Sequence, residues 1–529
     1  MNILGLTGGF HFGSCDAAAS IVQDGRLIAA VEEERCTRIK GSMSIPPNKC
    51  IQAALTAGGL GIGDIDYVAL YVEGYPEAES EMRDHLITIF GYCPEIKLIN
   101  HHLCHAASAY YASGLEQSAI ICVDWSGDGV STSIWRGTNN TLELLDSIKL
   151  PNSLGMFYAA MTQFLGFSRG DEYKVMGLAP FGKRIINLDS ILDLSDPLYS
   201  LNPDIISQRC RNMNQSVFAP ALESILPGFF RPSTAPLLQK HKDLALSVQS
   251  YYEKALLQIA KYAIQKTGIN TLCIAGGCGL NCRANGLLLR QEWLDEVYVP
   301  PFPNDTGCSY GAACIVSHRN GVAPQPLSTA MLGPSYRDDE IKKELDVLNL
   351  NATKQSDISG YIAEQIASGK IIGWFQGRLE IGPRALGARS ILADPRQPNI
   401  KDKINATIKF REDFRPFAPS VLKSESFQYF DSHHDSPYMS FTMNIRDQES
   451  FPGITHVDGS SRVQTVSDAS PFHDLLCNFG RITGHPMLLN TSFNYMGQPI
   501  VSQPREAIGT FFSTGLNTLA LGSWVIEKG

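Results

Sequence analysis

One pattern of short apolar segments occurs twice in the first 145 residues. The segments of the two copies are 2–6, 17–22 and 27–31, then 119–123, 130–135 and 142–145. In each copy a polar stretch follows the first segment, and a turn separates the last two. Asp24-Gly25 between two apolar segments is a strong hairpin signal. A strand, a polar loop and a hairpin, used twice, predict two related halves that face a cleft.

This layout is that of the actin, sugar-kinase and Hsp70 class, where two polar loops approach a nucleotide from opposite sides. The chain is therefore predicted to be α/β, with an N-terminal domain of this class. The second loop contributes Gly127 and Asp128 as candidate nucleotide-binding residues. Further candidates, Gly276, Gly277 and Asn281, follow an apolar strand at 271–275 and precede a helix, where backbone N–H groups can receive phosphate. A tight turn without a ligand explains this second group equally well.

A histidine pair follows within the same domain. Asn100 can cap a helix and Gly114 can end it, which places His101 and His105 four residues apart on one face. Such a pair commonly holds a divalent metal. Asp124 ends the next predicted strand, so a mixed imidazole and carboxylate site is plausible.

Two other groups have simpler explanations. Asp305 lies at a strand-to-helix turn, where the residues alone favour a helix cap over a ligand. Cys278 and Cys282 are four apart, but no second Cys/His pair has the spacing of a zinc site.

Size and charge exclude several functions. A chain of 529 residues is long enough for two or three domains. Its net charge of −9 argues against nucleic acid as a partner. There is no apolar run of the roughly 18 residues that a membrane span needs, and the N-terminus does not resemble a signal peptide. The 13 cysteines are typical of a reduced, cytoplasmic protein.

A second unit is predicted after a connector at 322–337. It begins with a helix near 358–368 and a strand at 371–375, and nine basic residues lie between Arg378 and Arg415. Arg384 and Arg415 lie among proline and apolar neighbours, as arginines that bind oxyanions bidentately often do. Residues 490–494 add hydroxyl and amide groups. These residues predict a small anionic ligand with a nucleotide nearby.

Seven stretches of this chain closely resemble the O-carbamoyltransferases of the NodU/CmcH/TobZ type, over nearly the whole length. They are 30–35, 101–106, 176–180, 276–277 with Asn281, 382–387, 414–419 and 490–494. The resemblance implies that residues 1–335 form a carbamoyl-transfer domain of the Kae/TsaD type, and that residues 336–529 form a YrdC-like domain. The second would make carbamoyl-adenylate from ATP and carbamoyl phosphate, with Mg²⁺. The first would transfer the carbamoyl group to a hydroxyl of a small-molecule natural product, helped by Fe(II) or another divalent metal.

The same resemblance implies which residues form the sites. The metal ligands would be His101, His105, Asp124 and Asp305, which raises Asp305 from cap to ligand. Carbamoyl phosphate and ATP would be bound by Arg378, Arg384, Lys409, Arg415, Arg462, Asn490, Thr491 and Ser492, with Lys409 and Arg415 also catalytic.

The chain departs from the family in its first polar loop. Family members carry His-Asp there, whereas this chain has Cys15-Asp16. His11 lies four residues before Cys15, so either His11 or Asp16 is a candidate for the general base.

The alternative function is modification of tRNA by a threonylcarbamoyl transferase. It needs an RNA-binding face, which the acidic pI disfavours. A kinase of the same fold class would leave the histidine pair unexplained, and a non-enzymatic scaffold would consume no ATP with carbamoyl phosphate. A homodimer is common among such relatives, and the sequence leaves the oligomeric state open.

Overall fold

A computed structural model describes residues 1–9, 15–195, 198–207, 215–467 and 469–528. The chain divides into two compact units. Unit 1 comprises residues 1–30, 41–51 and 58–328, and unit 2 comprises residues 31–40, 52–57 and 329–529. Of the described helices, none is long and apolar enough to cross a membrane.

The first sheet of unit 1 has five strands in the order β3-β2-β1-β4-β5. Their bounds are β1 Asn2–Thr7, β2 Ala18–Gln23, β3 Arg26–Glu32, β4 Tyr67–Leu70 and β5 Glu95–Leu98. β1 pairs antiparallel with β2 and parallel with β4, and β4 pairs parallel with β5.

The second sheet repeats this arrangement, with the order β12-β11-β6-β7-β8. Its strands are β6 Gln117–Gly127, β7 Val130–Thr138, β8 Thr141–Lys149, β11 Thr271–Ala275 and β12 Glu296–Tyr298. β6 pairs antiparallel with β7 and parallel with β11, as β1 does with β2 and β4. The predicted duplication is therefore confirmed, and with it the α/β class of this unit.

Two helices at the core of unit 1 carry the site described below. α4 spans His101–Ser113 and α10 spans Asp305–Arg319. Small residues let them pack closely: a Cβ on Gly311 of α10 would lie 1.9 Å from the Cys104 carbonyl oxygen of α4. A Cβ on Gly5 of β1 would lie 1.8 Å from the Ser309 carbonyl oxygen, so α10 also lies directly against the first sheet. This packing brings the first turns of α4 and α10 together.

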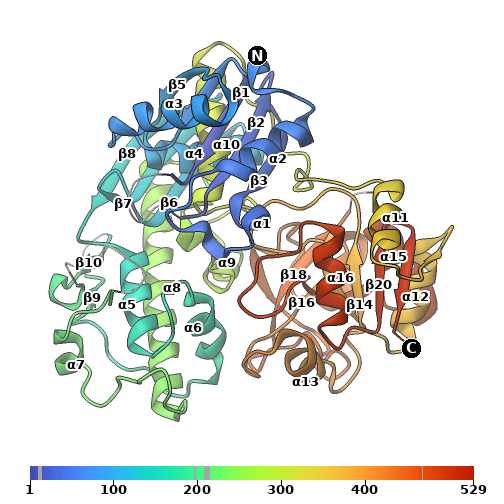
Figure 1. The fold of residues 1–529 in the computed structure, drawn as a ribbon. Coiled ribbons are helices and arrows are strands. Elements are labelled where there is room, and N and C mark those ends of the chain that lie inside the picture. The colour runs from blue at the N-terminus through green and yellow to red at the C-terminus, as the bar shows by residue number, and fades with distance from the viewer. Residues whose placement is uncertain (10–14, 196–197, 208–214, 468, 529) are drawn as a thin grey trace. The chain divides into compact units, whose positions relative to one another are not determined.

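The other helices and short strands before residue 328 are labelled in Figure 1. They are α1 Glu33–Thr37, which is grouped with unit 2, α2 Asn48–Gly58, α3 Glu77–Phe90, α5 Leu154–Phe164, α6 Glu172–Leu178, β9 Leu192–Asp193, β10 Ser200–Leu201, α7 Ala221–Ile225, α8 Gln239–Thr267 and α9 Cys282–Leu288.

Unit 2 is built on a nine-stranded mixed sheet in the order β13-β21-β20-β14-β15-β19-β16-β18-β17. The strands are β13 Thr353–Lys354, β14 Ile372–Phe375, β15 Arg389–Ala393, β16 Ala418–Leu422, β17 Phe441–Asn444, β18 Ser460–Val466, β19 Met487–Ser492, β20 Thr518–Leu521 and β21 Trp524–Glu527. The helices are α11 Asp338–Val347, α12 Ile358–Ala367, α13 Ile400–Ile404, α14 Ser426–Tyr429, α15 Pro471–Thr483 and α16 Pro504–Phe512.

The core of unit 2 lies between this sheet and the helices α12 and α15. Trp374 of β14 is fully buried there, among leucine, isoleucine and phenylalanine side chains of both helices. The helix and strand predicted at 358–368 and 371–375 are confirmed as α12 and β14, and residues 322–337 form neither helix nor strand, as expected of a connector.

Candidate metal centre and anion-binding site

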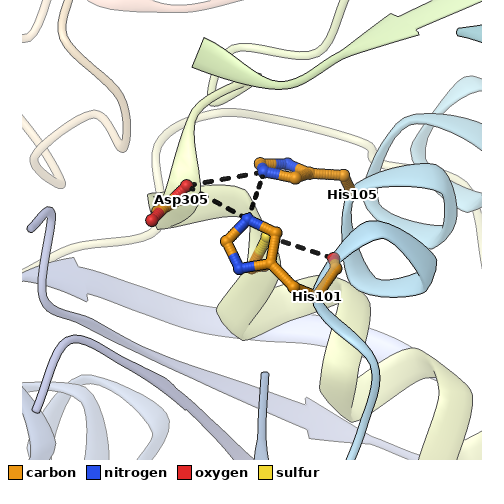
Figure 2. Close-up of side chains that lie close together, drawn as sticks. His101, His105 and Asp305 are labelled. Atoms are coloured by element: carbon orange, nitrogen blue, oxygen red, sulfur yellow. Dashed lines mark hydrogen bonds and ion pairs between the residues drawn. The ribbon is translucent and has the colours of Figure 1, made fainter. Parts of the chain in front are cut away.

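The histidine pair lies on the first turns of α4, as its spacing predicts. The Asn100 side chain accepts a hydrogen bond from the Leu103 N–H at 3.1 Å, and Gly114 ends the helix in a left-handed conformation. His101 and His105 therefore share a face, and their Nε2 atoms are 3.0 Å apart (Figure 2). Both side chains are buried.

Asp305 faces this pair from the start of α10. Asn304 occupies the cap position, so Asp305 is not the N-cap that the residues alone favoured. Its Oδ1 lies 3.4 Å from His105 Nε2 and 3.7 Å from His101 Nε2 (Figure 2). The carboxylate is thus directed toward both imidazoles.

Asp124 approaches the same histidines from β6. Its Oδ2 lies 3.7 Å from His101 Nε2, and its Oδ1 accepts the Gly277 N–H at 2.8 Å. Gly276 makes this contact possible, because its φ is +88° and a Cβ there would lie 2.1 Å from the Val123 carbonyl oxygen. In this structure the double glycine orients a carboxylate.

The sulfur of Cys308 completes the group. The donor atoms of His101, His105, Asp305 and Cys308 all lie within 4.8 Å of one another. Cys308 is not among the metal ligands expected from the sequence. Its only signal is the position three residues after Asp305, which places both residues on one face of a helix.

The donor atoms fit a divalent metal. Ligands about 2.0–2.3 Å from a tetrahedral metal are separated by roughly 3.3–3.8 Å. The Nε2 and Oδ1 atoms of His101, His105 and Asp305 are 3.0 to 3.7 Å apart. His105 Nδ1 is buried without a hydrogen bond from any described residue, so the described protein atoms leave this imidazole incompletely satisfied.

The carboxylates of the candidate metal centre favour a positive charge among them. Burial alone would lower the pKa of His101, but Asp305 and Asp124 outweigh burial and raise it. Burial would raise the pKa of Asp124, but the histidines and the Gly277 N–H lower it. These opposing shifts are expected where carboxylates surround a site for a cation.

Two of the predicted nucleotide-binding residues, Gly127 and Asp128, also support the histidines. Asp128 accepts hydrogen bonds from the His101 N–H at 2.9 Å and from Asn100 Nδ2 at 3.2 Å, and so holds the start of α4. A Cβ on Gly127 would lie 2.0 Å from His101 Cγ, so only glycine leaves room for the imidazole ring.

Asn281, another predicted nucleotide ligand, caps α9 by accepting the Ala284 N–H and also pairs with Gln249. A nucleotide role for Gly127, Asp128, Gly276, Gly277 and Asn281 stays a prediction.

The first polar loop is described only in part. Asp16 Oδ2 accepts a hydrogen bond from Asn304 Nδ2 at 2.7 Å, which joins the loop to the residue that caps α10. Cys15 as a whole is partly exposed, but burial around its sulfur and the charge of Asp16 raise the pKa of the thiol. His11 lies outside the described residues.

Lys409 is the centre of the second site, in unit 2. The side chain is buried, and Nζ donates to both the carbonyl and the hydroxyl of Ser492 and to the Asn494 carbonyl and Oδ1. These partners are neutral. Burial, with the charges of Arg411, Arg415 and Lys40, holds the pKa of Lys409 well below that of an ordinary lysine. Several cations close together favour an anionic ligand.

The other predicted anion ligands have different surroundings. Arg462 and Arg384 are partly exposed, and Arg462 Nε is buried without a hydrogen bond to the described residues. Arg415 lies 3.5 Å from the Glu412 carboxylate. Thr491 is a partly exposed residue of β19, next to Ser492.

Arg378 and Asn490 have structural partners. Arg378 donates to the carbonyls of Leu332 and Gly333, which lie in the connector. Asn490 is buried, and its Nδ2 donates to Ser420 Oγ and Gln464 Oε1. In this structure both side chains stabilise unit 2, and their role in ligand binding stays a prediction.

Family models of carbamoyltransferases match most of the chain. A family model described as Carbamoyltransferase N-terminus matches residues 2–88 and 81–314, and one described as Carbamoyltransferase C-terminus matches residues 363–528. The chain is 37% identical to Nodulation protein NolNO of Sinorhizobium fredii, over 100% of this chain and 83% of the relative.

The chain also resembles a second relative and a solved structure. The chain is 34% identical to the uncharacterized protein sll1178 of Synechocystis, over 100% of this chain and 97% of the relative. The crystal structure of full-length HypF in its phosphate- and nucleotide-bound form matches with a TM-score of 0.36 and 15% identity, over 61% of this chain and 56% of that one. At so low a score, the fold assignment rests on the strand order described above.

Proposed function

The chain belongs to the carbamoyltransferase family, and from this premise we propose that it is an ATP-dependent O-carbamoyltransferase. Its donor would be carbamoyl phosphate, and its acceptor a hydroxyl of a small-molecule natural product. The observation that carries the proposal is the buried Lys409 among arginines in unit 2, because such a cluster suits a phosphate-bearing substrate. The structural expectations that accompany it are a Kae/TsaD-type fold for unit 1 and a YrdC-type fold for unit 2.

The proposed first reaction takes place in unit 2. Carbamoyl phosphate and water give carbamate and inorganic phosphate. A carbamate oxygen then attacks the α-phosphorus of ATP, so that carbamoyl-adenylate forms and pyrophosphate leaves. Lys409 and Arg415 would offset the repulsion between the two polyanions and orient the attack. Arg384 and Arg462 would bind further phosphate oxygens.

The proposed second reaction transfers the carbamoyl group in unit 1. His101, His105 and Asp305, with Asp124 close to them, would hold a divalent metal. Such a metal polarises a carbonyl oxygen and lowers the pKa of a bound hydroxyl. Asp16 is the described candidate that could accept the acceptor's proton. The carbonyl carbon then bonds to the acceptor oxygen, and AMP leaves.

Pyrophosphate release and carbamoyl transfer separate the two reactions experimentally. The purified full chain is incubated with ATP and carbamoyl phosphate, with and without a panel of hydroxylated natural products. We expect pyrophosphate release that depends on carbamoyl phosphate, and a carbamoylated product with one acceptor class.

Two variants test the assignment of each reaction to its site. Lys409→Ala should abolish pyrophosphate release, whereas His101→Ala should preserve it and stop transfer. Normal release by Lys409→Ala with an unchanged KM for carbamoyl phosphate would contradict the proposal. Threonylcarbamoylation of tRNA by the wild type would replace it with the alternative function.

A further inference from the structure

Cys308 offers a fourth donor atom close to His101, His105 and Asp305. It lies on the first turn of α10, three residues after Asp305, and its side chain is fully buried. Its Sγ is one of the four donor atoms that lie within 4.8 Å of one another. The thiol also lies 4.0 Å from the His101 carbonyl oxygen, a weak contact that does not fix its orientation.

Asp124 is the competing candidate for the same position. One of its carboxylate oxygens already accepts the Gly277 N–H at 2.8 Å, and the other lies 3.7 Å from His101 Nε2. That second oxygen is as close to His101 Nε2 as Asp305 Oδ1 is, so a thiolate from Cys308 would bind beside Asp124 and does not require Asp124 to leave the site.

We propose that Cys308 is a thiolate ligand of the metal centre, together with His101, His105 and Asp305. The inference rests on the metal site of the proposed function and adds the chemical class of the ion. A set of two imidazoles, one carboxylate and one thiolate suits Zn²⁺, Co²⁺ or Fe²⁺, whereas Mg²⁺ and Mn²⁺ prefer oxygen ligands.

Binding is a proton exchange without any redox change. A cysteine binds a metal through its thiolate form, whereas an unligated thiol carries a proton. A metal coordinated by sulfur replaces that proton, which is released to the solvent. One proton from this thiol is therefore released for each metal bound.

Cobalt provides a direct spectroscopic test. Metal-stripped full-length protein is titrated with Co²⁺, and absorption is recorded in the near-ultraviolet and visible ranges. We expect one equivalent to produce a sulfur-to-cobalt charge-transfer band. Cys308→Ser should lose this band but retain the visible bands of bound cobalt. Cys314→Ser is the matched control, because Cys314 is also buried on α10, six residues further on, and should keep the full spectrum.

Zinc competition measures how much Cys308 contributes to the preference of the site for Zn²⁺ over Mg²⁺. Cys308→Ser should weaken Zn²⁺ binding by more than the roughly 10–100-fold that is typical of losing an outer-shell partner. Its weak binding of Mg²⁺ should change little. X-ray absorption of the zinc-loaded wild type tests the sulfur ligand directly and does not need the variant to fold. We expect one sulfur at about 2.3 Å from the metal.

The outcomes distinguish this inference from the proposed function. Cobalt bound without a charge-transfer band, a band that survives Cys308→Ser, or zinc with only nitrogen and oxygen neighbours would overturn the thiolate ligand and leave the carbamoyltransferase proposal intact. Failure of any divalent metal to bind would overturn both the thiolate and the metal-assisted transfer. It would still leave carbamoyl-adenylate formation in unit 2 open to its own assay.

Discussion

The imidazole of His101 determines which residues can surround it. Gly127 leaves room for its ring, Asp128 accepts its backbone N–H, and two carboxylates lie within 3.7 Å of its Nε2. Gly127 and Asp128 therefore have structural reasons for their identity, whatever ligand the nearby loop binds.

Gly127→Ala tests this steric argument. The new Cβ would lie 2.0 Å from His101 Cγ, so the ring must move. We expect a loss of about 1–3 kcal/mol of unfolding free energy, as for other overpacked sites, and weaker Co²⁺ binding. Calorimetry and cobalt titration measure the two effects. Gly63→Ala, where a Cβ meets no atom within 4 Å, should change neither. Unchanged cobalt affinity in Gly127→Ala would show that the ring position is not critical.

If carbamoyl phosphate binds at Lys409 as proposed, its binding should be sensitive to pH. In the free protein its pKa lies well below that of an ordinary lysine, and a bound anion should raise it. Binding is then strongest below the free-site pKa and weakens as the pH rises through it. We expect the KM for carbamoyl phosphate to rise with pH, well before an unperturbed lysine, at about pH 10.4, would titrate.

The matched variant for this pH dependence is Lys409→Arg. Arginine keeps its charge to about pH 12, so any residual activity of the variant should show a flat KM over the same range. A flat profile in the wild type would mean that Lys409 does not contact the substrate.

At the scale of the element, the start of α4 determines the position of the histidine pair. The helix is capped by Asn100, and Asp128 from the end of the neighbouring strand accepts hydrogen bonds from both Asn100 and His101. Two separate acceptors thus fix the first turn, on which His101 lies.

Loss of either acceptor should loosen this turn. We expect Asn100→Ala to cost about 1 kcal/mol, as a lost N-cap typically does, and Asp128→Asn to cost a similar amount. Denaturant unfolding measures the stability, and cobalt titration shows whether the histidines remain in place. Because the two side chains bond to each other, the double variant should cost less than the sum of the single ones. Strict additivity would show that they act independently.

At the scale of the whole molecule, the two candidate sites belong to different units. The metal centre lies in unit 1, and the site around Lys409 lies in unit 2. Each site is formed by residues of its own unit. Carbamoyl-adenylate formation and carbamoyl transfer, as proposed, should therefore be separable from each other.

Metal removal is the test at this scale. Protein stripped with a chelator should keep its pyrophosphate release from ATP and carbamoyl phosphate, assayed with Mg²⁺ present, and lose carbamoyl transfer. Transfer should return with Zn²⁺, Co²⁺ or Fe²⁺. Full transfer by the stripped protein would make the metal incidental, and loss of pyrophosphate release would place the metal in the first reaction instead.

Some features of this protein follow from local sequence alone. The cap at Asn100, the end at Gly114 and the spacing of His101 and His105 operate within a few residues, so α4 could be predicted. The duplicated strand pattern could also be predicted, because alternating apolar segments and turns are short-range signals.

Other features were decided only by tertiary packing. Cys308 joins the histidines because Gly311 lets α10 approach α4, and no local pattern contains that contact. Arg378 and Asn490 have the residue types of anion ligands, and only the tertiary structure shows that they also donate to backbone carbonyls and to buried side chains distant in sequence. The physical reason is that residue type and spacing determine what a side chain can bind, whereas long-range packing determines which partners are within reach.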